Sequence, residues 1–278
     1  MESKKVWFIT GCDSGMGHTA AKILLEKGDR VVVTALHKKN IFTLLDAYPE
    51  NARGYELDVK NTLQIKKVVE QAVTDYGSID VLFNNAGYGI MGAAEETTEE
   101  DYRNMFDVNL FGLIEVTKAV LPHMRKKRAG YIFNTSSLGG YSASPGVALY
   151  AASKFAVEGF SDALSQEVEA LGIKVAVLEP GSFRTKFAGT SLQRIPSLIK
   201  DYEKTAVGNT TNRLNSRDGC QPNDPAKLAE ILYVLSRKNR FPFRLQFGED
   251  AISRVRTRLE VTQNDLNEWE SVGRSCSF

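Results

Sequence analysis

This sequence of 278 residues contains few cysteines and histidines, and its net charge is close to zero. The three cysteines, Cys12, Cys220 and Cys276, are odd in number and far apart, which argues against a disulfide framework and against a CxxC metal or redox site. No two of the three histidines have the spacing of metal ligands, so we expect no metal. The formal charge of +1 gives no field that would gather nucleic acid. These shortages favour reduced thiols in a cytoplasmic protein.

Long hydrophobic runs are also missing. The amino-terminal stretch MESKKVWFIT contains an apolar run too short for a signal peptide, and nothing reaches the roughly 20 apolar residues of a membrane span. We therefore expect no membrane anchor. The one dense basic run, Arg125–Arg128, follows a helical pattern, and we interpret it as a solvated helix end rather than a binding patch.

What the sequence does contain is an alternation of apolar, β-branched runs with helix-length segments such as 19–28, 62–77 and 151–171. The apolar runs lack polar alternation, as do strands covered on both faces. No linker divides the chain, so the pattern predicts one α/β domain over residues 1–278 with a doubly wound parallel sheet and helices on both faces. The seven predicted strands are residues 5–10, 30–36, 54–59, 80–87, 130–137, 173–181 and 244–248.

One long segment, residues 186–224, has no clear pattern and is rich in Ser, Thr, Asn and Arg. Within it, the stretch RIPSLIKDYEKT at 194–205 is predicted to form a short helix. The segment follows the carboxyl end of a strand, where open α/β sheets bind ligands, and we therefore interpret it as a substrate lid. A disordered loop is the alternative interpretation.

A glycine-rich turn joins the first predicted strand to the first predicted helix. Glycines there permit a tight turn, let backbone N–H groups approach a pyrophosphate and aim the positive end of the helix at it. Alone the turn is a weak signal, but it opens a predicted βαβ unit and so indicates nucleotide binding. The residues expected to contact the nucleotide are Gly11, Asp13, Ser14, Gly15, Met16 and Gly17.

The spacing G-x-x-x-G-x-G, the NNAG at 84–87 and the pair Tyr150 and Lys154 resemble the short-chain dehydrogenase/reductase family over essentially the whole chain, in its retinol- and hydroxysteroid-dehydrogenase-like branch. The resemblance implies a Rossmann-type fold and an NAD(P)-dependent oxidoreductase that interconverts an alcohol with its ketone or aldehyde. It also implies that Asp58 meets the adenine and that Thr185 lies beside the nicotinamide carboxamide. The matching cofactor positions are Asp58, Val59, Asn85, Ala86, Gly87, Tyr150, Lys154, Pro180, Gly181, Phe183 and Thr185. Plainer interpretations exist for Asp58 as a strand-end turn residue, for NNAG as a tight loop and for Pro180 and Gly181 as loop residues, and the pair Tyr150 and Lys154 could be a core aromatic with an exposed cation.

The choice between NAD and NADP depends on the end of the second predicted strand. Leu36 there is neither the acid that accepts ribose hydroxyls nor the base that receives a 2′-phosphate. His37, Lys38 and Lys39 could attract the phosphate or be the solvated start of a helix. Asp13 would repel the phosphate and accept ribose hydroxyls. The pattern favours NAD(H) and leaves NADP(H) open.

Four residues match the family's active-site set. If Tyr150 begins a helix, Lys154 lies one turn further on the same face. The ammonium, together with the charge of an oxidised nicotinamide, would lower the phenol pKa from about 10 and so fit Tyr150 for proton exchange. Ser137 would hold the substrate oxygen, with Ser136 as its structural neighbour.

Asn109 matches the fourth member of the set. Within a strongly helical stretch its amide could support a water that links Lys154 to solvent, or could simply mark a local helix kink. The complete set argues against a non-catalytic NAD(P)-sensing regulator. A 3-oxoacyl-carrier-protein reductase shares the set, but the chain continues to Phe278, beyond the usual end of such reductases.

Two long helical stretches, 100–127 and 150–171, carry apolar residues on more than one side. A helix of this kind needs partners beyond its own sheet. Family members commonly pair these helices across a two-fold axis, so the resemblance implies a homodimer or homotetramer. Packing within the subunit is the alternative. The apolar residues concerned are Phe106, Leu110, Leu113, Ala156, Phe160 and Leu164.

Overall fold

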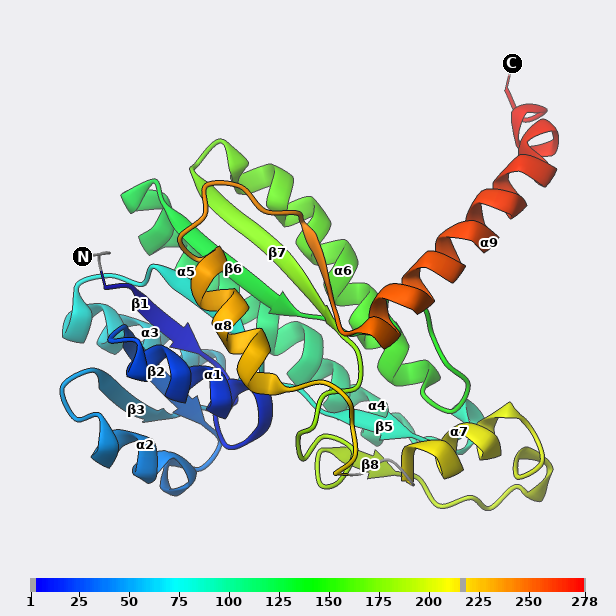
Figure 1. Cartoon of the computed structure of the whole chain (residues 1–278), viewed down its shortest axis with the longest axis horizontal. Coiled ribbons are helices and arrows are strands. Elements are labelled where there is room, and N and C mark those ends of the chain that lie inside the picture. The colour runs from blue at the N-terminus through cyan, green and yellow to red at the C-terminus, as the bar shows by residue number, and fades with distance from the viewer. Residues whose placement is uncertain (1–3, 216–218, 278) are drawn as a thin grey trace.

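The computed structural model describes residues 4–215 and 219–277, and it arranges them around a seven-stranded parallel sheet of order β3-β2-β1-β4-β6-β7-β9 (Figure 1). This order confirms the predicted doubly wound α/β fold. Each predicted strand is present and is shorter than the range expected from the sequence. The strands are β1 (Val6–Ile9), β2 (Arg30–Ala35), β3 (Ala52–Glu56), β4 (Val81–Asn84), β6 (Gly130–Thr135), β7 (Ile173–Pro180) and β9 (Arg244–Phe247).

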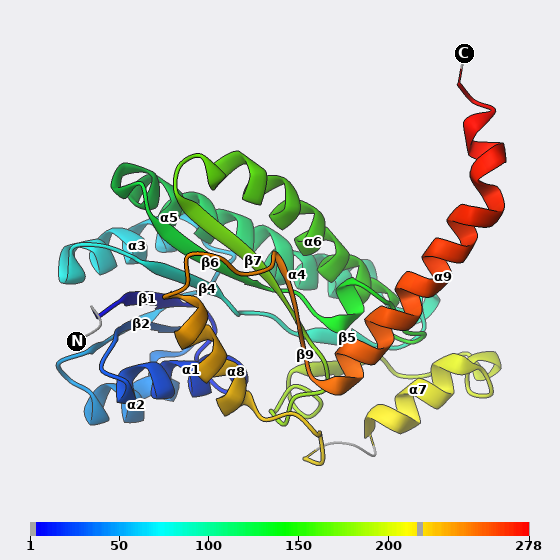
Figure 2. The same ribbon diagram turned by 45° about the horizontal axis from the view of Figure 1, so that its top comes forward.

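Helices cover both faces of the sheet (Figure 2). One face carries α1 (Gly15–Glu26), α2 (Phe42–Ala47) and α8 (Pro225–Leu235). The other carries α3 (Thr62–Tyr76), α5 (Leu113–Lys127) and α6 (Ala148–Glu169). The remaining helical elements are η1 (Lys38–Ile41), η2 (Ala94–Glu96), α4 (Glu99–Phe106), η3 (Asp107–Gly112), η4 (Leu138–Gly140), η5 (Lys200–Tyr202), α7 (Ala206–Asn215) and α9 (Glu249–Arg274).

The uniformly apolar strands follow from this two-sided cover. Along β1, Trp7 and Ile9 enter one core and Phe8 enters the other, because successive side chains of a strand point to opposite faces. Leu82 and Phe83 of β4 divide in the same way. Both faces are buried, so neither needs the polar residues that would produce alternation.

The helix predicted for 194–205 is wrong. Residues 192–194 form strand β8 (Leu192–Arg194), which pairs with β5 (Gly89–Met91) in a separate two-stranded sheet. Pro196 follows at once; it has no N–H to donate and disfavours the helical conformation at the preceding residue. The backbone N–H groups of Leu198 and Ile199 instead bind the Glu96 carboxylate. Only η5 and, further on, α7 are helical within the predicted lid, of which residues 216–218 lie outside the described residues.

The basic run at 125–128 ends α5, as expected. Its side chains are exposed, and Arg128 terminates the helix in the left-handed conformation with φ of 57°. Three cations in the last turn complement the negative end of the helix dipole.

Helix α9 leaves the body of the molecule and carries the chain end away from it (Figures 1 and 2). Ala251 and Val255, in its first two turns, are buried. Beyond Val255 nearly every described side chain of the helix is exposed, including Leu259, Leu266 and Trp269. Most of α9 therefore has no tertiary packing within this chain.

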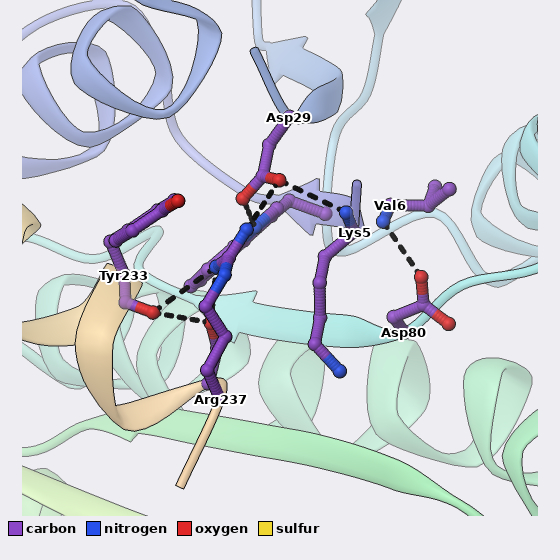
Figure 3. A network of polar contacts seen from close by, with 8 residues as sticks. Lys5, Val6, Asp29, Asp80, Tyr233 and Arg237 are labelled. Carbon is purple, nitrogen blue, oxygen red and sulfur yellow. Dashed lines mark hydrogen bonds and ion pairs between the residues drawn. The ribbon is translucent and has the colours of Figure 1, made fainter. Parts of the chain in front are cut away.

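A buried carboxylate, that of Asp29, connects β1 with the end of α8 on the α1 side of the sheet (Figure 3). Asp29 is 1% exposed, and its oxygens accept hydrogen bonds from the Trp7 indole at 2.9 Å and from Arg237 at 2.6 Å. The Lys5 backbone N–H donates to it as well, at 2.9 Å. The Arg237 guanidinium lies over the Tyr233 ring, 3.6 Å from its centroid. The network ties β1 to the end of α8.

The sequence predicts neither a membrane-spanning segment nor a metal site. Among residues 4–215 and 219–277, no helix has the length and hydropathy needed to cross a membrane. The same residues contain no cluster of three or more His, Cys, Asp or Glu side chains placed to hold a metal. Cys12 is buried, Cys220 and Cys276 are exposed, and all three thiols are free.

Candidate active site

A cavity of about 370 Å³ opens at the carboxyl ends of the central strands. It is walled by the segment after β6, the start of α6, the loop after β7, α7 and the first turns of α9. Phe187, which the sequence did not indicate, packs on Tyr150 with the ring centroids 5.7 Å apart. The predicted site residues that line the cavity are Met16, Asn85, Gly87, Ser137, Tyr150, Lys154, Pro180, Gly181, Phe183 and Thr185.

Tyr150 and Lys154 lie as their spacing predicts. Helix α6 begins at Ala148, so Tyr150 is in its first turn and Lys154 is one turn further on. The Lys154 ammonium is 5.9 Å from the centroid of the Tyr150 ring and donates a hydrogen bond to the Thr135 carbonyl at 2.8 Å. That carbonyl is at the end of β6, so the central sheet fixes the lysine.

The pKa values of this pair are set mainly by burial. Burial raises the pKa of Tyr150 to about 12, while a hydrogen bond with Ser137 acts in the opposite direction. Burial also lowers the pKa of Lys154 to about 8, against the attraction of Glu158. Desolvation of the phenolate therefore dominates in the protein without cofactor, and the expected lowering of the Tyr150 pKa by Lys154 together with an oxidised nicotinamide stays a prediction.

Ser137 adjoins Tyr150 across a tight turn. Its hydroxyl accepts a hydrogen bond from the Gly139 N–H at 3.0 Å, which begins η4. A methyl group placed on Gly139 would lie 3.4 Å from the Ser137 hydroxyl and 3.7 Å from the Tyr150 ring, so both groups face one small space. Ser136 is buried and its hydroxyl donates to the Lys154 carbonyl, which fits its expected structural part.

Asn109 lies behind the cavity rather than in its wall. It is fully buried in η3, a π-helical segment between α4 and α5, and such segments often occur at functional sites. Its amide accepts from the Tyr88 N–H at 3.0 Å and donates to the Tyr88 carbonyl at 2.9 Å and to Ser153 at 3.1 Å. A Cβ on Gly87 would lie 2.9 Å from the Asn109 oxygen and 3.5 Å from the Lys154 nitrogen. Asn109 and Lys154 thus flank one glycine.

The glycine turn is shaped by close backbone contacts. Gly11 has φ of 72°, and a Cβ on it would lie 2.8 Å from Ala86. A Cβ on Gly17 would lie 2.4 Å from the Asn85 amide, which itself donates to the Gly11 carbonyl at 2.9 Å. Ser14 precedes α1 in an extended conformation without capping the helix through its side chain. The first N–H groups of α1 therefore remain for an anion such as a pyrophosphate.

Asp13 reaches from the glycine turn to the end of β2. Its carboxylate accepts hydrogen bonds from the Leu36 N–H at 3.3 Å and from the Asn40 amide at 3.0 Å. Glu56, which the sequence did not indicate, lies beside the end of β2 because Ala35 of β2 is in register with Glu56 of β3, and its carboxylate accepts from the Lys38 N–H at 3.3 Å. His37 precedes η1, whose basic residues begin a short exposed helical turn.

Three further predicted cofactor positions are Asp58, Val59 and Thr185. Asp58 accepts from the Lys60 N–H at 2.9 Å and so serves as a turn residue, which leaves its place at an adenine untested. Val59 is buried against Gly112. A Cβ on Gly15 would lie 3.5 Å from Thr185, so the loop after β7 closes onto the glycine turn. The glycine turn and the loop that carries Thr185 are therefore adjacent.

The sequence analysis also missed a charged cluster behind Lys154. Arg244 on β9 lies 3.2 Å from Glu158 and 3.7 Å from Glu179, and both carboxylates are buried. Burial raises the pKa of Glu158 to about 7 and raises that of Glu179. The i, i+4, i+8 spacing of Tyr150, Lys154 and Glu158 was the available signal.

We expect Glu158→Gln to flatten the pH dependence of stability. A carboxyl whose folded pKa is about 7 against an ordinary 4.5 holds its proton more tightly when folded, so the free energy of unfolding falls as pH rises between these values and is level above them. The wild type should lose at most about 3 kcal/mol over this range. Urea unfolding at several pH values measures it. The exposed Glu167→Gln on the same helix should leave the slope unchanged, and an equal slope in both variants would contradict the assignment.

Comparison with known proteins agrees with this geometry. The short chain dehydrogenase family model matches residues 5–195. Oxidoreductase BOA17 of Botryotinia fuckeliana is 37% identical over 96% of this chain and 97% of its own. A 3-ketodihydrosphingosine reductase of Bacteroides thetaiotaomicron is 38% identical over 88% of both chains.

Two solved structures are also similar to this chain. A short-chain dehydrogenase from Streptomyces avermitilis is 38% identical and superposes with a TM-score of 0.93 over 99% of this chain and 100% of its own. ElxO with NADP bound is 28% identical, with a TM-score of 0.74 over 90% of this chain and 100% of its own. The chain belongs to the short-chain dehydrogenase/reductase family and is an NAD(P)-dependent oxidoreductase.

Proposed function

We propose that the enzyme interconverts an alcohol and its carbonyl compound with Tyr150 as the group that donates and accepts the proton. The observation that carries this is the convergence of Ser137, Tyr150 and Lys154 on one largely apolar cavity at the carboxyl ends of the strands. When bound, the nicotinamide supplies or accepts the hydride.

The chain's own residues have distinct parts in this reaction. In the reductive direction the Tyr150 phenol gives its proton to the carbonyl oxygen, and a pKa of about 12 keeps that proton on the free enzyme at neutral pH. The Ser137 hydroxyl donates a hydrogen bond to the same oxygen as negative charge develops there. Lys154 holds the hydroxyls of the nicotinamide ribose and, through its charge, eases the return of the proton. Asn109 supports a water beside Lys154.

A panel of alcohols and carbonyl compounds offered with each cofactor tests the proposal. Substrate-dependent change in NAD(P)H absorbance is the expected result. Binding of NADH without turnover of any member of the panel would instead favour a cofactor sensor.

We further propose NAD(H) as the preferred cofactor. The Asp13 carboxylate reaches the end of β2 from the glycine turn, and Glu56 ends the adjacent strand β3, so two carboxylates lie near the end of β2, where a ribose 2′-hydroxyl is usually bound. Both would repel a 2′-phosphate. Lys38 and Lys39 are the opposing charges, and they lie in the exposed turn η1.

Asp13→Ala is expected to shift the preference towards NADP(H) by roughly tenfold, since one screened carboxylate–phosphate repulsion is worth about 1 kcal/mol or slightly more. The ratio of kcat/KM for the two cofactors measures the shift. The exposed Asp46→Ala on α2 serves as the control. A wild-type enzyme that already prefers NADPH by a wide margin would overturn the NAD(H) assignment in favour of the basic turn.

Residues 186–224 are proposed to act as the substrate lid. Phe187, Leu192 and Leu214 from this segment line the cavity opposite the catalytic residues. The α7 backbone at Val207 also approaches Gly146, because a Cβ there would lie 3.5 Å from the Val207 carbonyl. Opening of the segment would give a substrate access to Tyr150.

We also propose a homodimer or homotetramer built on α4, α5 and α6. Leu113 and Leu164 are buried within the subunit, while the other four apolar residues singled out in these helices are half-buried. Phe111 and Phe155, on the same elements, are about half exposed. Light scattering of the purified enzyme tests the assembly, and a monomer mass with full activity would refute it.

The free thiols Cys220 and Cys276, both exposed, support a reducing, cytoplasmic location.

A further inference from the structure

Arg254 is an arginine in the wall of the catalytic cavity whose partners are neutral. It projects from α9, and its guanidinium donates to the Ser142 hydroxyl at 3.2 Å and to the Ala143 carbonyl. Burial and the nearby charge of Arg213 both lower its pKa. A guanidinium held in a half-buried wall without an anion is costly, because part of its hydration is lost.

The other charges around the cavity do not neutralise Arg254. The charged residues among the described lining are Lys154, Arg213, Asp250 and Arg254. Asp250 is already engaged, with one oxygen accepting from the Ser182 N–H at 2.7 Å and the other from the Asn223 amide at 2.9 Å. No described carboxylate lies within ion-pair distance of Arg254. Asp250 is therefore not available to neutralise Arg254.

We propose that the substrate carries a carboxylate that pairs with Arg254, so that the enzyme acts on an apolar oxo or hydroxy acid. This inference rests on the proposed function, which places the reacting oxygen at Ser137 and Tyr150. The wall between the two ends is apolar, with Leu138, Val147 and Phe187 facing the space. An arginine fork binds a carboxylate through two parallel hydrogen bonds, which would fix the far end of the substrate.

The competing interpretation is that Arg254 only anchors the 142–143 loop to α9. An anchor would affect every substrate equally, because the loop precedes the helix that carries Tyr150. A carboxylate-binding residue would affect only substrates with the acid group, and mainly through KM. The two roles can therefore be separated by paired substrates.

The experiment compares medium-chain oxo acids with their methyl esters, using wild type, Arg254→Gln and Arg254→Lys. Wild type should prefer the acids by at least roughly tenfold in kcat/KM. Arg254→Gln should lose that preference, because kcat/KM for the acids falls mainly through KM and by roughly tenfold more than kcat/KM for the esters, and Arg254→Lys should recover part of it. Equal use of acid and ester by wild type, or an equal loss on both in Arg254→Gln, would overturn the proposal.

A second readout separates this proposal from the proposed function. The acids should raise the melting temperature of the wild-type, cofactor-loaded protein and should raise that of Arg254→Gln less, whether or not they are turned over. Stabilisation without turnover would reject the reaction and retain the carboxylate site. Turnover of neutral compounds alone, with no stabilisation by acids, would retain the reaction and reject the site.

The projecting part of α9 carries an independent inference. Val255, Leu259, Thr262, Leu266 and Trp269 recur at intervals of four and three residues, which places them on one face of the helix. Val255 is buried on the body, whereas Leu259, Leu266 and Trp269 are 51%, 60% and 61% exposed. A helical stretch of this length is marginal without packing, so this apolar stripe requires a partner.

Charge along α9 indicates which partner fits. Beyond Val255 the helix carries first Arg256, Arg258 and Glu260, with a net charge of +1, and then Asp265, Glu268, Glu270 and Arg274, with a net charge of −2. Two parallel copies would bring like charges together, and an antiparallel pair brings the basic half of each copy against the acidic half of the other. The acidic half would also be repelled by an anionic membrane. We infer that α9 pairs with α9 of a second copy of this chain in an antiparallel coiled coil.

Light scattering of the full chain tests the pairing. Leu266→Glu should halve the molecular mass, and Val261→Glu, off the stripe and also exposed, should not. Arg256→Glu with Arg258→Glu should weaken assembly, and adding Asp265→Arg with Glu270→Arg should restore it. An unchanged mass in Leu266→Glu, including one accompanied by binding to lipid vesicles or another protein, would reject self-pairing. A halved mass in both single variants would reject the stripe.

Discussion

Replacing Tyr150 with phenylalanine is expected to reduce turnover by roughly 10²–10⁴-fold, the usual contribution of a positioned acid or base. The change removes one oxygen and leaves the ring, so the packing against Phe187 and the fold should persist. Cofactor binding should also survive, because the glycine turn and Thr185 are untouched. Steady-state rates together with NADH fluorescence titration measure both parts of this expectation.

A matched control separates the catalytic hydroxyl from the general effect of losing a phenol. Tyr48→Phe removes a hydroxyl that bonds only the exposed Glu26, on the α1 side of the sheet. Its turnover should equal that of the wild type. Near-normal activity in Tyr150→Phe would reject Tyr150 as the proton donor, and loss of cofactor binding would show that the variant is not a clean probe of the proton.

Loss of the buried Asp29 carboxylate should have the largest effect on stability. Asp29→Leu removes the carboxylate of the buried ion pair with Arg237 and the acceptor of the Trp7 N–H, and breaking one half of a buried ion pair costs about 3–5 kcal/mol. Denaturant unfolding measures the loss. By contrast, Arg103→Ala breaks an exposed pair with Glu99 and should cost less than about 1 kcal/mol.

A double variant distinguishes the ion pair from simple overpacking at this position. Asp29→Leu combined with Arg237→Met replaces both charges with apolar groups and should recover part of the stability, because no unpaired charge remains. A double variant less stable than Asp29→Leu would indicate that leucine does not fit the site. A single variant within about 1 kcal/mol of wild type would contradict the buried pair.

The sheet could be predicted from the sequence because both of its faces are buried. In a run such as Val31–Val33, alternate side chains are buried in the two cores, so every position is apolar and the strand is visible in the sequence as an unbroken apolar run. β5 and β8 gave no such signal, since each has three residues and their pairing depends on a contact between segments far apart in the sequence. The expected helix at 194–205 failed at Pro196, a local feature that the sequence did contain.

The site was predictable where its residues lie close together in the chain. Tyr150 and Lys154 share a helix face by spacing alone. Glu56 and Arg254 reach their places through strand register and through α9, neither of which is visible in a local motif. The raised pKa of Tyr150 in the protein without cofactor could not be predicted from the sequence, because the extent of burial depends on segments such as that at Phe187, whose position is set by the tertiary fold.

The packing of α8 on α1 has a consequence for how the protein is made. Leu228, Ala229 and Leu232 of α8 share a core with Ala20 and Leu24 of α1. α1 is among the first segments to leave the ribosome, and its outer face stays uncovered until residues near 235 have emerged. The glycine turn therefore gains its mature support only when most of the chain has been synthesised. A nascent chain stopped before Pro225 would present an exposed apolar helix to chaperones and would bind the cofactor poorly.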